Sequence, residues 1–337
     1  MAKTRTRFGA PTRPAPKQKK RSDPRGQMRK RRTFVGALGL LLVLDAVLVH
    51  LALDAGSPRR SEAVSAPTSD VVPSSYPAQV PTETESPPPA QPPAASVPTR
   101  IISALDGITA WRATTGVCPD ALALPELTTD SGATFTPTNA TISSDVVALQ
   151  SIAVDDEDVA TMIGQSSDDC SPMLVRTFVG GLNYEEFAPG LVDVWYLNPL
   201  NRAEVHRPDS TVAAPCANVV ALAAQDLVSA AVLCDDQTVF TTADGAVTWS
   251  SPVVAPGAIN IASTSEGFVV ATVAAEGCAG VQLARLAEAL TPSGCLPIDT
   301  EPEALVGNVA LSIADGVLWL WAGDSLVRSS DGGMTWL

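Results

Sequence analysis

The chain has 337 residues and a formal net charge of −14, but its charges are unevenly divided along the sequence. Residues 1–33 contain thirteen lysines or arginines and one acidic residue, whereas the chain from Asp54 onward contains nine arginines, no lysine and 34 acidic residues. A segment this acidic repels phosphate backbones, which argues against nucleic acid as its partner.

The first predicted element after the basic cytoplasmic tail of residues 1–33 is a transmembrane helix over residues 34–53. Its twenty mostly apolar residues, at about 1.5 Å rise per residue, cover the roughly 30 Å hydrocarbon layer of a membrane. The basic run RKRR at Arg29–Arg32 precedes the helix, and the positive-inside rule then keeps the N-terminus in the cytoplasm. We expect a single-pass type II protein of the plasma membrane, attached through residues 34–53 and extracytoplasmic beyond them.

A cleaved export signal is the alternative to a retained anchor, since RRTFV at Arg31–Val35 resembles the start of a twin-arginine signal. We favour the anchor because the apolar run is long for a signal peptide and no small-residue cleavage pattern follows it. Asp45, in the middle of the predicted helix, is costly to insert as a charged group. It is either a contact for a partner helix, which would make the protein an accessory subunit, or a tolerated protonated residue.

Residues 54–99 are predicted to form a disordered linker rich in Pro, Ser and Thr. Eleven prolines between Gly56 and Thr99 favour an extended polyproline II conformation at about 3.1 Å per residue. The high Ala and Val content, with all five lysines confined to the basic tail, resembles proteins of high-GC Gram-positive bacteria (actinobacteria). By this analogy the linker is a spacer that carries the next domain through a cell wall.

Residues 100–337 are predicted to form an all-β domain. Short apolar or alternating segments such as VVALQSIAV, NVVALAAQD and GVLWLWAG are separated by Gly, Asp, Asn and Pro turns. Similar strands recur roughly every 40 residues, and six such units have the size of four-stranded propeller blades. The expected fold is a six-bladed β-propeller, with a seven-bladed ring as the alternative.

All six cysteines lie in this domain, at Cys118, Cys170, Cys216, Cys234, Cys278 and Cys295. An even number confined to the exported part indicates disulfides formed in an oxidising compartment. Zinc is disfavoured because there is no CxxC pair and the domain has a single histidine. We expect Cys216 to pair with Cys234 and Cys278 with Cys295, since each pair flanks a hairpin-sized segment, which leaves Cys118 for Cys170.

The segment SSDGGMTW, Ser329–Trp336, recurs upstream at Thr128–Phe135, at Thr242–Trp249 and, in a more diverged form, at Thr177–Tyr184. This pattern resembles the Asp-box, or bacterial neuraminidase repeat, S/T-x-D-x-G-x-T-W, which forms the turn between the third and outermost strands of a propeller blade. The resemblance implies a structural role, in which Asp accepts backbone N–H groups, Gly adopts a positive φ and the aromatic residue packs. The residues concerned are Asp130, Gly132, Asp244, Trp249, Ser329, Asp331, Gly333 and Trp336.

Sialidases are the best-known proteins with this repeat, so a sialidase-like glycoside hydrolase is the alternative function. Such chemistry needs an arginine cluster that holds the substrate carboxylate, a Tyr nucleophile beside a Glu, and an Asp acid. The domain has only seven arginines, none in the FRIP context of that family. Tyr196 is the single nucleophile candidate, because Tyr184 takes the place of the Trp of the repeat. No catalytic residue is assigned.

Other chemistry has few candidate residues. Ser-His-Asp or Cys-His catalysis would depend on His206 alone, which we interpret as a loop residue. The acidic run Asp155–Asp158 could bind Ca²⁺ weakly with Asp168 and Asp169, but a solvated turn between strands is the favoured interpretation. No Gly-rich phosphate loop is found, and we expect neither a metal nor a cofactor.

The last predicted blade has no residues for a fourth strand after Trp336. We expect Arg100–Ala104 (RIISA) to supply that strand and close the ring, the alternative being an edge that pairs with a partner chain. The favoured function is a membrane-anchored extracytoplasmic propeller that acts as a non-catalytic binding or assembly module for a protein or a cell-wall glycan.

Overall fold

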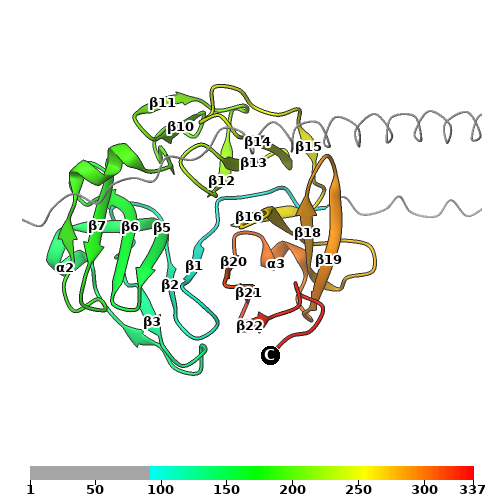
Figure 1. Cartoon of the computed structure of the whole chain (residues 1–337), viewed down its shortest axis with the longest axis horizontal. Coiled ribbons are helices and arrows are strands. Elements are labelled where there is room, and N and C mark those ends of the chain that lie inside the picture. Colours follow the sequence, from blue (N-terminus) through cyan, green and yellow to red (C-terminus); the bar gives the residue numbers. More distant parts are fainter. Residues whose placement is uncertain (1–91) are drawn as a thin grey trace, which may run out of the picture. The chain divides into compact units, whose positions relative to one another are not determined.

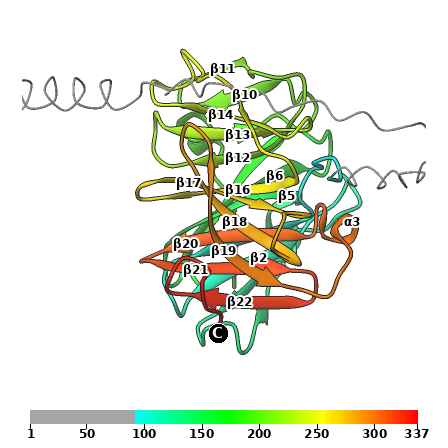
Figure 2. The same ribbon diagram turned by 90° about the vertical axis from the view of Figure 1, so that its right-hand side faces the viewer.

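The computed structural model describes residues 92–337, so the predicted basic tail, the transmembrane helix and most of the predicted linker lie outside the described residues. Within residues 92–337 the chain forms six antiparallel sheets arranged in a ring (Figure 1, and from the side in Figure 2). The fold is the predicted all-β, six-bladed β-propeller. No helix of this part of the chain has the length and apolar character needed to cross a membrane.

The blades follow one another in chain order, and in most of them the strands run in sequence from the innermost to the outermost. Blade 1 consists of β1 (Arg100–Ala104), β2 (Ala110–Thr114), β3 (Glu126–Thr128) and β4 (Thr136–Pro137). Blade 2 consists of β5 (Val146–Asp156), β6 (Val159–Ser166), β7 (Pro172–Thr177) and β8 (Glu185–Glu186). Blade 3 consists of β9 (Tyr196–Leu197), β10 (Glu204–Arg207) and β11 (Ser210–Ala213). Blade 4 consists of β12 (Val219–Ala224), β13 (Ala230–Cys234), β14 (Thr238–Thr242) and β15 (Val253–Val254). Blade 5 consists of β16 (Ala258–Thr264), β17 (Gly267–Thr272), β18 (Gly280–Leu286) and β19 (Leu290–Pro297). Blade 6 consists of β20 (Val309–Ala314), β21 (Val317–Ala322) and β22 (Ser325–Ser329). The helical turns are α2 (Thr141–Ser144), η2 (Ala188–Asp193) and α3 (Pro302–Leu305).

The hydrophobic core is divided into clusters that lie between neighbouring blades, because a strand with a blade on each side buries both of its faces. β13, for example, is buried at every residue. Five such clusters are present, between blades 1 and 2 (Trp111, Met162), 3 and 4 (Val205, Val232), 4 and 5 (Leu233, Ile261), 5 and 6 (Leu283, Leu320), and 6 and 1 (Ile102, Trp319). A closed ring of six blades has six such junctions, and in the described residues the junction of blades 2 and 3 has no cluster of its own.

The segment Arg100–Ala104 is β1, the innermost strand of blade 1, where it pairs with β2. The prediction that it completes the last blade is therefore wrong. As the innermost strand of blade 1, this segment buries the side chain of Ile102 against blade 6. At the outer edge of the last blade the same side chain would not be covered in this way. The ring closes by packing of β1 on β20, and the backbone N–H of Thr99 donates to the carbonyl of Gly307 at 2.7 Å.

The two ends of the ring are distinct, and we name them after the inner strands. At the starting end the inner strands begin, and at the turn end they turn back into the second strands. Residues 92–99, which the sequence assigns to the linker, pack at the starting end: Ala95 is buried between blades 4 and 5, and Gln237 donates to the carbonyl of Pro93. The folded part of the chain thus begins before Arg100.

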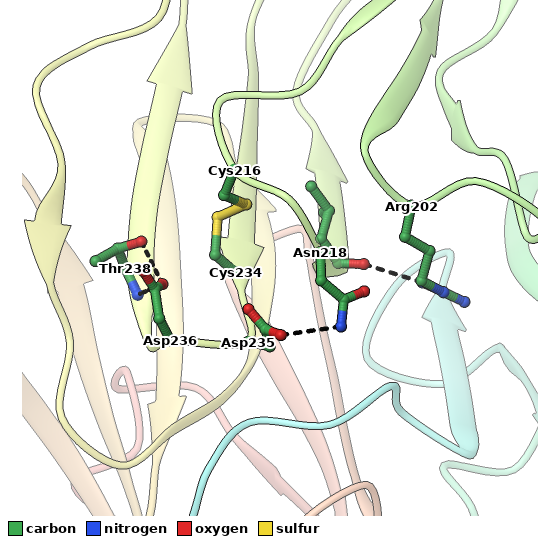
Figure 3. The surroundings of a disulfide bond; sticks show 8 residues. Arg202, Cys216, Asn218, Cys234, Asp235, Asp236 and Thr238 are labelled. Carbon is green, nitrogen blue, oxygen red and sulfur yellow. Dashed lines mark hydrogen bonds between the residues drawn. A yellow bond between two sulfur atoms is a disulfide. The ribbon is translucent and has the colours of Figure 1, made fainter.

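Three disulfides join Cys118 to Cys170, Cys216 to Cys234, and Cys278 to Cys295, which are the pairs expected from the sequence. Each involves a loop at the starting end. Cys118–Cys170 links the loop that follows β2 to the loop between β6 and β7, and so connects blade 1 to blade 2. Figure 3 shows Cys216–Cys234 beside the first residues of β12.

Candidate functional site

A cavity of about 660 Å³ occupies the centre of the ring. Its walls are the inner strands β1, β5, β12, β16 and β20, together with β9, and Val97 and Pro98 lie across its starting end. The wall is mostly apolar, with hydroxyl, amide and arginine groups at intervals. Its volume lies in the range of known ligand sites, about 300–1,000 Å³.

Blade 3 differs from the other blades because, among the described residues, it has no strand that corresponds to their inner strands. Trp195, just before β9, donates its indole N–H to the carbonyl of Asp226 at 2.9 Å, in the turn that ends β12. The loop after β9 lies at the other end, since the N–H of Val219 donates to the carbonyl of Arg202 at 3.0 Å where β12 begins. β9 therefore runs opposite to β12, in the direction of a second strand, and the segment with η2 packs on β7, the third strand of blade 2, so within residues 92–337 the inner position of blade 3 has no strand.

The cavity extends sideways into the space that this missing strand leaves. Thr161, Ile163 and Gln165 of β6 line the cavity, whereas the second strands β2, β13, β17 and β21 contribute no lining residue. This side pocket, bounded by β5, β6 and β9, coincides with the junction of blades 2 and 3 that has no core cluster. The alternating apolar segment GLVDVWYL, residues 190–197, predicts a strand that begins near Leu191, but this prediction is wrong because Ala188–Asp193 forms η2 and only Tyr196 and Leu197 are in a strand. The one sequence signal of the irregular blade is that residues 191–214 contain no segment resembling the repeat.

A bulge in β5 forms one wall of the side pocket. Val147 pairs with Gln165 and Ser151 pairs with Ile163, so three residues of β5 face the single residue Gly164 of β6. A Cβ atom on Gly164 would lie 2.6 Å from the carbonyl oxygen of Val147, which explains why glycine is found there. Bulges of this kind redirect side chains and are frequent beside functional sites.

The bulge places an amide at the cavity without a partner. Ala148 has a φ of 42°, an uncommon conformation for a residue with a side chain, and its N–H donates to the carbonyl of Ala121 at 2.7 Å. Gln150, two residues further, lines the cavity, and its Nε2 is buried without a hydrogen-bond partner. Gln165 lines the same pocket from β6. Buried amide groups normally find partners, so Gln150 is an amide of the cavity wall whose hydrogen bonding is incomplete within the described residues.

The opposite wall is β9, where the rings of Tyr196 and His206 stack with centroids 4.2 Å apart. Nδ1 of His206 lies 3.0 Å from the carbonyl oxygen of Val194. His206 belongs to β10, so the interpretation as a loop residue is wrong; its pairing with Tyr196 in the sheet fixes it there. Burial raises the pKa of Tyr196, so this phenol is not activated as a nucleophile.

Arg202 lies at the starting end of the cavity, in the loop between β9 and β10. Its guanidinium donates to the carbonyl of Val219 at 3.2 Å, drawn in Figure 3, and pairs with no carboxylate in the described residues. Burial lowers its pKa, which reflects the cost of holding this charge away from water. Arg100, the other arginine of the cavity wall, instead stacks on Trp321.

The sialidase arrangement is not assembled in the described residues. Of the seven arginines of the propeller only Arg100 and Arg202 line the cavity, and others have structural contacts such as the 2.9 Å ion pair of Arg176 with Asp155. The Tyr196 hydroxyl makes no hydrogen bond to a carboxylate in this part of the chain. The run Asp155–Asp158 ends β5 and enters the turn before β6, and residues 92–337 contain no group of three or more potential metal-ligating side chains.

The predicted repeat residues lie in turns after the third strands, away from the cavity lining. In the last copy, Asp331 accepts hydrogen bonds from the hydroxyl of Ser329 at 2.7 Å and from the N–H and hydroxyl of Thr335 at 2.9 and 2.7 Å. Equivalent bonds surround Asp130 and Asp244. In each case, hydrogen bonds from the threonine four residues on lower the aspartate pKa to about 2.

Each repeated turn packs against the preceding blade. Trp336 of blade 6 donates its indole N–H to the carbonyl of Cys295 in blade 5 at 2.8 Å, and Gly333 lies against Gly294 of the same strand. Gly132 of blade 1 lies against Trp319 of blade 6. Trp249 packs on the cluster of blades 3 and 4, although its Nε1 has no partner. The turns thus join blades, and they contribute no group to the cavity.

Comparison with known proteins finds no matching family model and no matching curated protein. Solved structures similar to the chain include YCF48 bound to a D1 peptide, at 17% identity over 73% of this chain and 82% of that one, with a TM-score of 0.29. They also include the GH74 xyloglucanase from Xanthomonas campestris (16%, 72% and 38%, TM-score 0.28) and the WD40 propeller domain of Doa1 (12%, 71% and 95%, TM-score 0.40). These similarities are low, and the six-bladed fold is defined by the sheet topology of this chain.

Proposed function

We propose that this protein is a membrane-anchored, extracytoplasmic β-propeller that binds a protein or a cell-wall glycan without chemical turnover. The apolar segment of residues 34–53 and the basic run before it support the anchor and its orientation. The three disulfides support an oxidising compartment. The assignment of the repeated turns to the Asp-box is part of the same proposal and is supported by the shared hydrogen bonds of Asp130, Asp244 and Asp331.

The central cavity is the observation that carries the proposal. It combines apolar walls with the amides of Gln150 and Gln165 and the charge of Arg202, a composition typical of ligand sites. In the described residues, no serine, cysteine or tyrosine of its wall is hydrogen-bonded to a base, which general acid–base or nucleophilic catalysis would need. A sialidase-like hydrolase is kept as the second candidate only because Tyr196 lines the cavity.

The test uses the full-length, oxidised protein in detergent micelles, immobilised and exposed to envelope proteins and to purified wall glycans, with a fluorogenic glycosidase panel in parallel. We expect saturable capture of one class of partner and no turnover. Turnover that Tyr196→Phe abolishes would replace this proposal by the hydrolase. Capture that is lost in Asp45→Leu but kept in cavity variants would favour recruitment through the predicted transmembrane helix.

A further inference from the structure

The vacant inner position of blade 3 indicates how a partner binds. We propose that an extended segment of a partner polypeptide adds to the free edge of β9 and becomes the innermost strand of this blade. The inference rests on the proposed binding function and names the site and the class of ligand. The other five blades each hold an inner strand of their own at this position, β1, β5, β12, β16 and β20.

The free edge of β9 offers backbone hydrogen bonds to such a segment. β9 pairs with β10 on one side only, through Tyr196 with His206 and Leu197 with Val205. Consecutive residues of an antiparallel strand direct their N–H and C=O groups to opposite edges, so one of the two residues faces the cavity. An unpaired strand edge is the feature to which extended peptides add in β-augmentation.

The wall opposite β9 offers side-chain amides. Gln150 and Gln165 border the side pocket, and the buried Nε2 of Gln150 has no partner among residues 92–337. An amide can donate to and accept from the peptide groups of a strand lying between β9 and β5. A peptide therefore satisfies both walls at once, whereas a glycan lacks the alternating N–H and C=O groups that the β9 edge needs.

Charge defines the direction and the sequence of the segment. The cavity has Arg202, which forms no ion pair with a described carboxylate, at its starting end and the exposed Asp193 and Asp226 near its turn end. The inner strands of the other blades begin at the starting end, and a segment with their direction runs antiparallel to β9. We expect five or six residues, the length of β1 or β12, with an acidic side chain near the N-terminal end to pair with Arg202.

The linker of this chain is a poorer candidate for the same position. Its eleven prolines between Gly56 and Thr99 interrupt most runs of the length required, and proline lacks the N–H that a strand donates. A second copy of the chain would present the same linker.

The experiment selects heptapeptides from a random phage-displayed library on the full-length, oxidised protein in micelles. The enriched peptide is then synthesised. We expect it to slow hydrogen exchange at the amides of residues 195–198, and N-methylation of alternate peptide bonds to weaken its binding about tenfold or more. N-methylation of the intervening bonds should change affinity much less, because only alternate N–H groups face β9.

Variants of the protein locate the site. Ser151, exposed to the cavity from β5, is replaced in Ser151→Trp to fill the pocket, and Thr211→Trp, on the outermost strand of blade 3, is the matched control. We expect the first to weaken peptide binding about tenfold and the second to leave it unchanged. Arg202→Gln should weaken only peptides that carry an acidic residue, a readout that remains if Ser151→Trp fails to fold.

Several results would overturn the inference. They are an enriched peptide that binds Ser151→Trp normally, exchange protection that omits β9, or protection in the protein alone of the β9 amide that faces away from β10, which would mean that the chain's own linker fills the position. Capture of a glycan alone in the first experiment would also overturn it while leaving the binding function intact. Turnover in the glycosidase panel would remove both.

Discussion

At the residue scale, one aspartate organises each repeated turn. Asp130, Asp244 and Asp331 each accept three hydrogen bonds or more from side chains and backbone within the same turn; Asp130 and Asp244 are exposed, and Asp331 is partly exposed. In blade 2, Val179 stands at the equivalent position, and only the bonds from the N–H groups of Val179 and Gly181 to the hydroxyl of Thr177 remain. The turn therefore forms without the carboxylate, which makes the aspartate a stabilising group that can be tested by substitution.

The first prediction concerns acid stability. These carboxylates have a folded pKa of about 2, below their ordinary value of 3.8, so they stabilise the fold above about pH 4 and lose that contribution as the pH falls toward 2. The triple change to asparagine should lower the thermal midpoint at pH 7 and flatten its fall between pH 4 and pH 2. Asp120→Asn, which removes an exposed carboxylate outside these turns, is the control. Parallel pH curves for the triple variant and the wild type would contradict the explanation.

At the element scale, the sequence predicted the strands that neighbouring blades cover on both faces, because their apolar runs are continuous. It mislocated elements whose position depends on distant partners. Arg100–Ala104 has an apolar pattern that suits any covered strand, and only packing against β20 makes it β1. The segment VVALQSIAV predicts one continuous strand, because nothing in it marks the three extra residues of the β5 bulge; the only signal is the glycine on the opposite strand.

The second prediction concerns that glycine. In Gly164→Ala the new methyl group would lie 2.7 Å from Cγ2 of Val146 and closer still to the carbonyl of Val147. Overpacking of this kind costs about 1–3 kcal/mol, which urea unfolding of the oxidised protein would measure. Gly116→Ala, which meets only the methyl group of Ala121 at 3.2 Å, should cost less. Equal losses in the two variants would show that the bulge tolerates a side chain.

The third prediction concerns the disulfide between blades 1 and 2. Cys118 and Cys170 are 52 residues apart, whereas Cys216 and Cys234 are 18 apart. Loop closure in the unfolded chain then gives about 4 kcal/mol for the first bridge and about 3 kcal/mol for the second. Replacing each pair by serine and comparing free energies of unfolding checks the order. A larger loss for Cys216–Cys234 would mean that local packing outweighs chain entropy.

At the scale of the whole molecule, the ring has six junctions and five core clusters. The number of blades followed from the repeat length, but the candidate site did not follow from any motif. Its residues come from separate blades: Gln150 and Gln165 from blade 2, and Tyr196 and Arg202 from blade 3. None of them matches a pattern, and they meet because blade 3 lacks an inner strand. In the described residues, the junction without a core cluster and the cavity lie at the same place, which is the arrangement expected if packing is given up there for the proposed binding.

The last prediction compares the junctions directly. Trp319 is fully buried between blades 6 and 1, and its indole N–H donates to the carbonyl of Asp106 at 2.8 Å, so Trp319→Ala should cost about 3–5 kcal/mol. Leu191 belongs to η2 at the junction of blades 2 and 3 and is only partly buried, so Leu191→Ala should cost about 1 kcal/mol or less. Urea unfolding measures both, and hydrogen exchange should be fastest along η2 because none of its side chains is buried. If Leu191→Ala proves as costly as Trp319→Ala, the junction beside the cavity is as well packed as the others, and a partner strand would have nothing to complete.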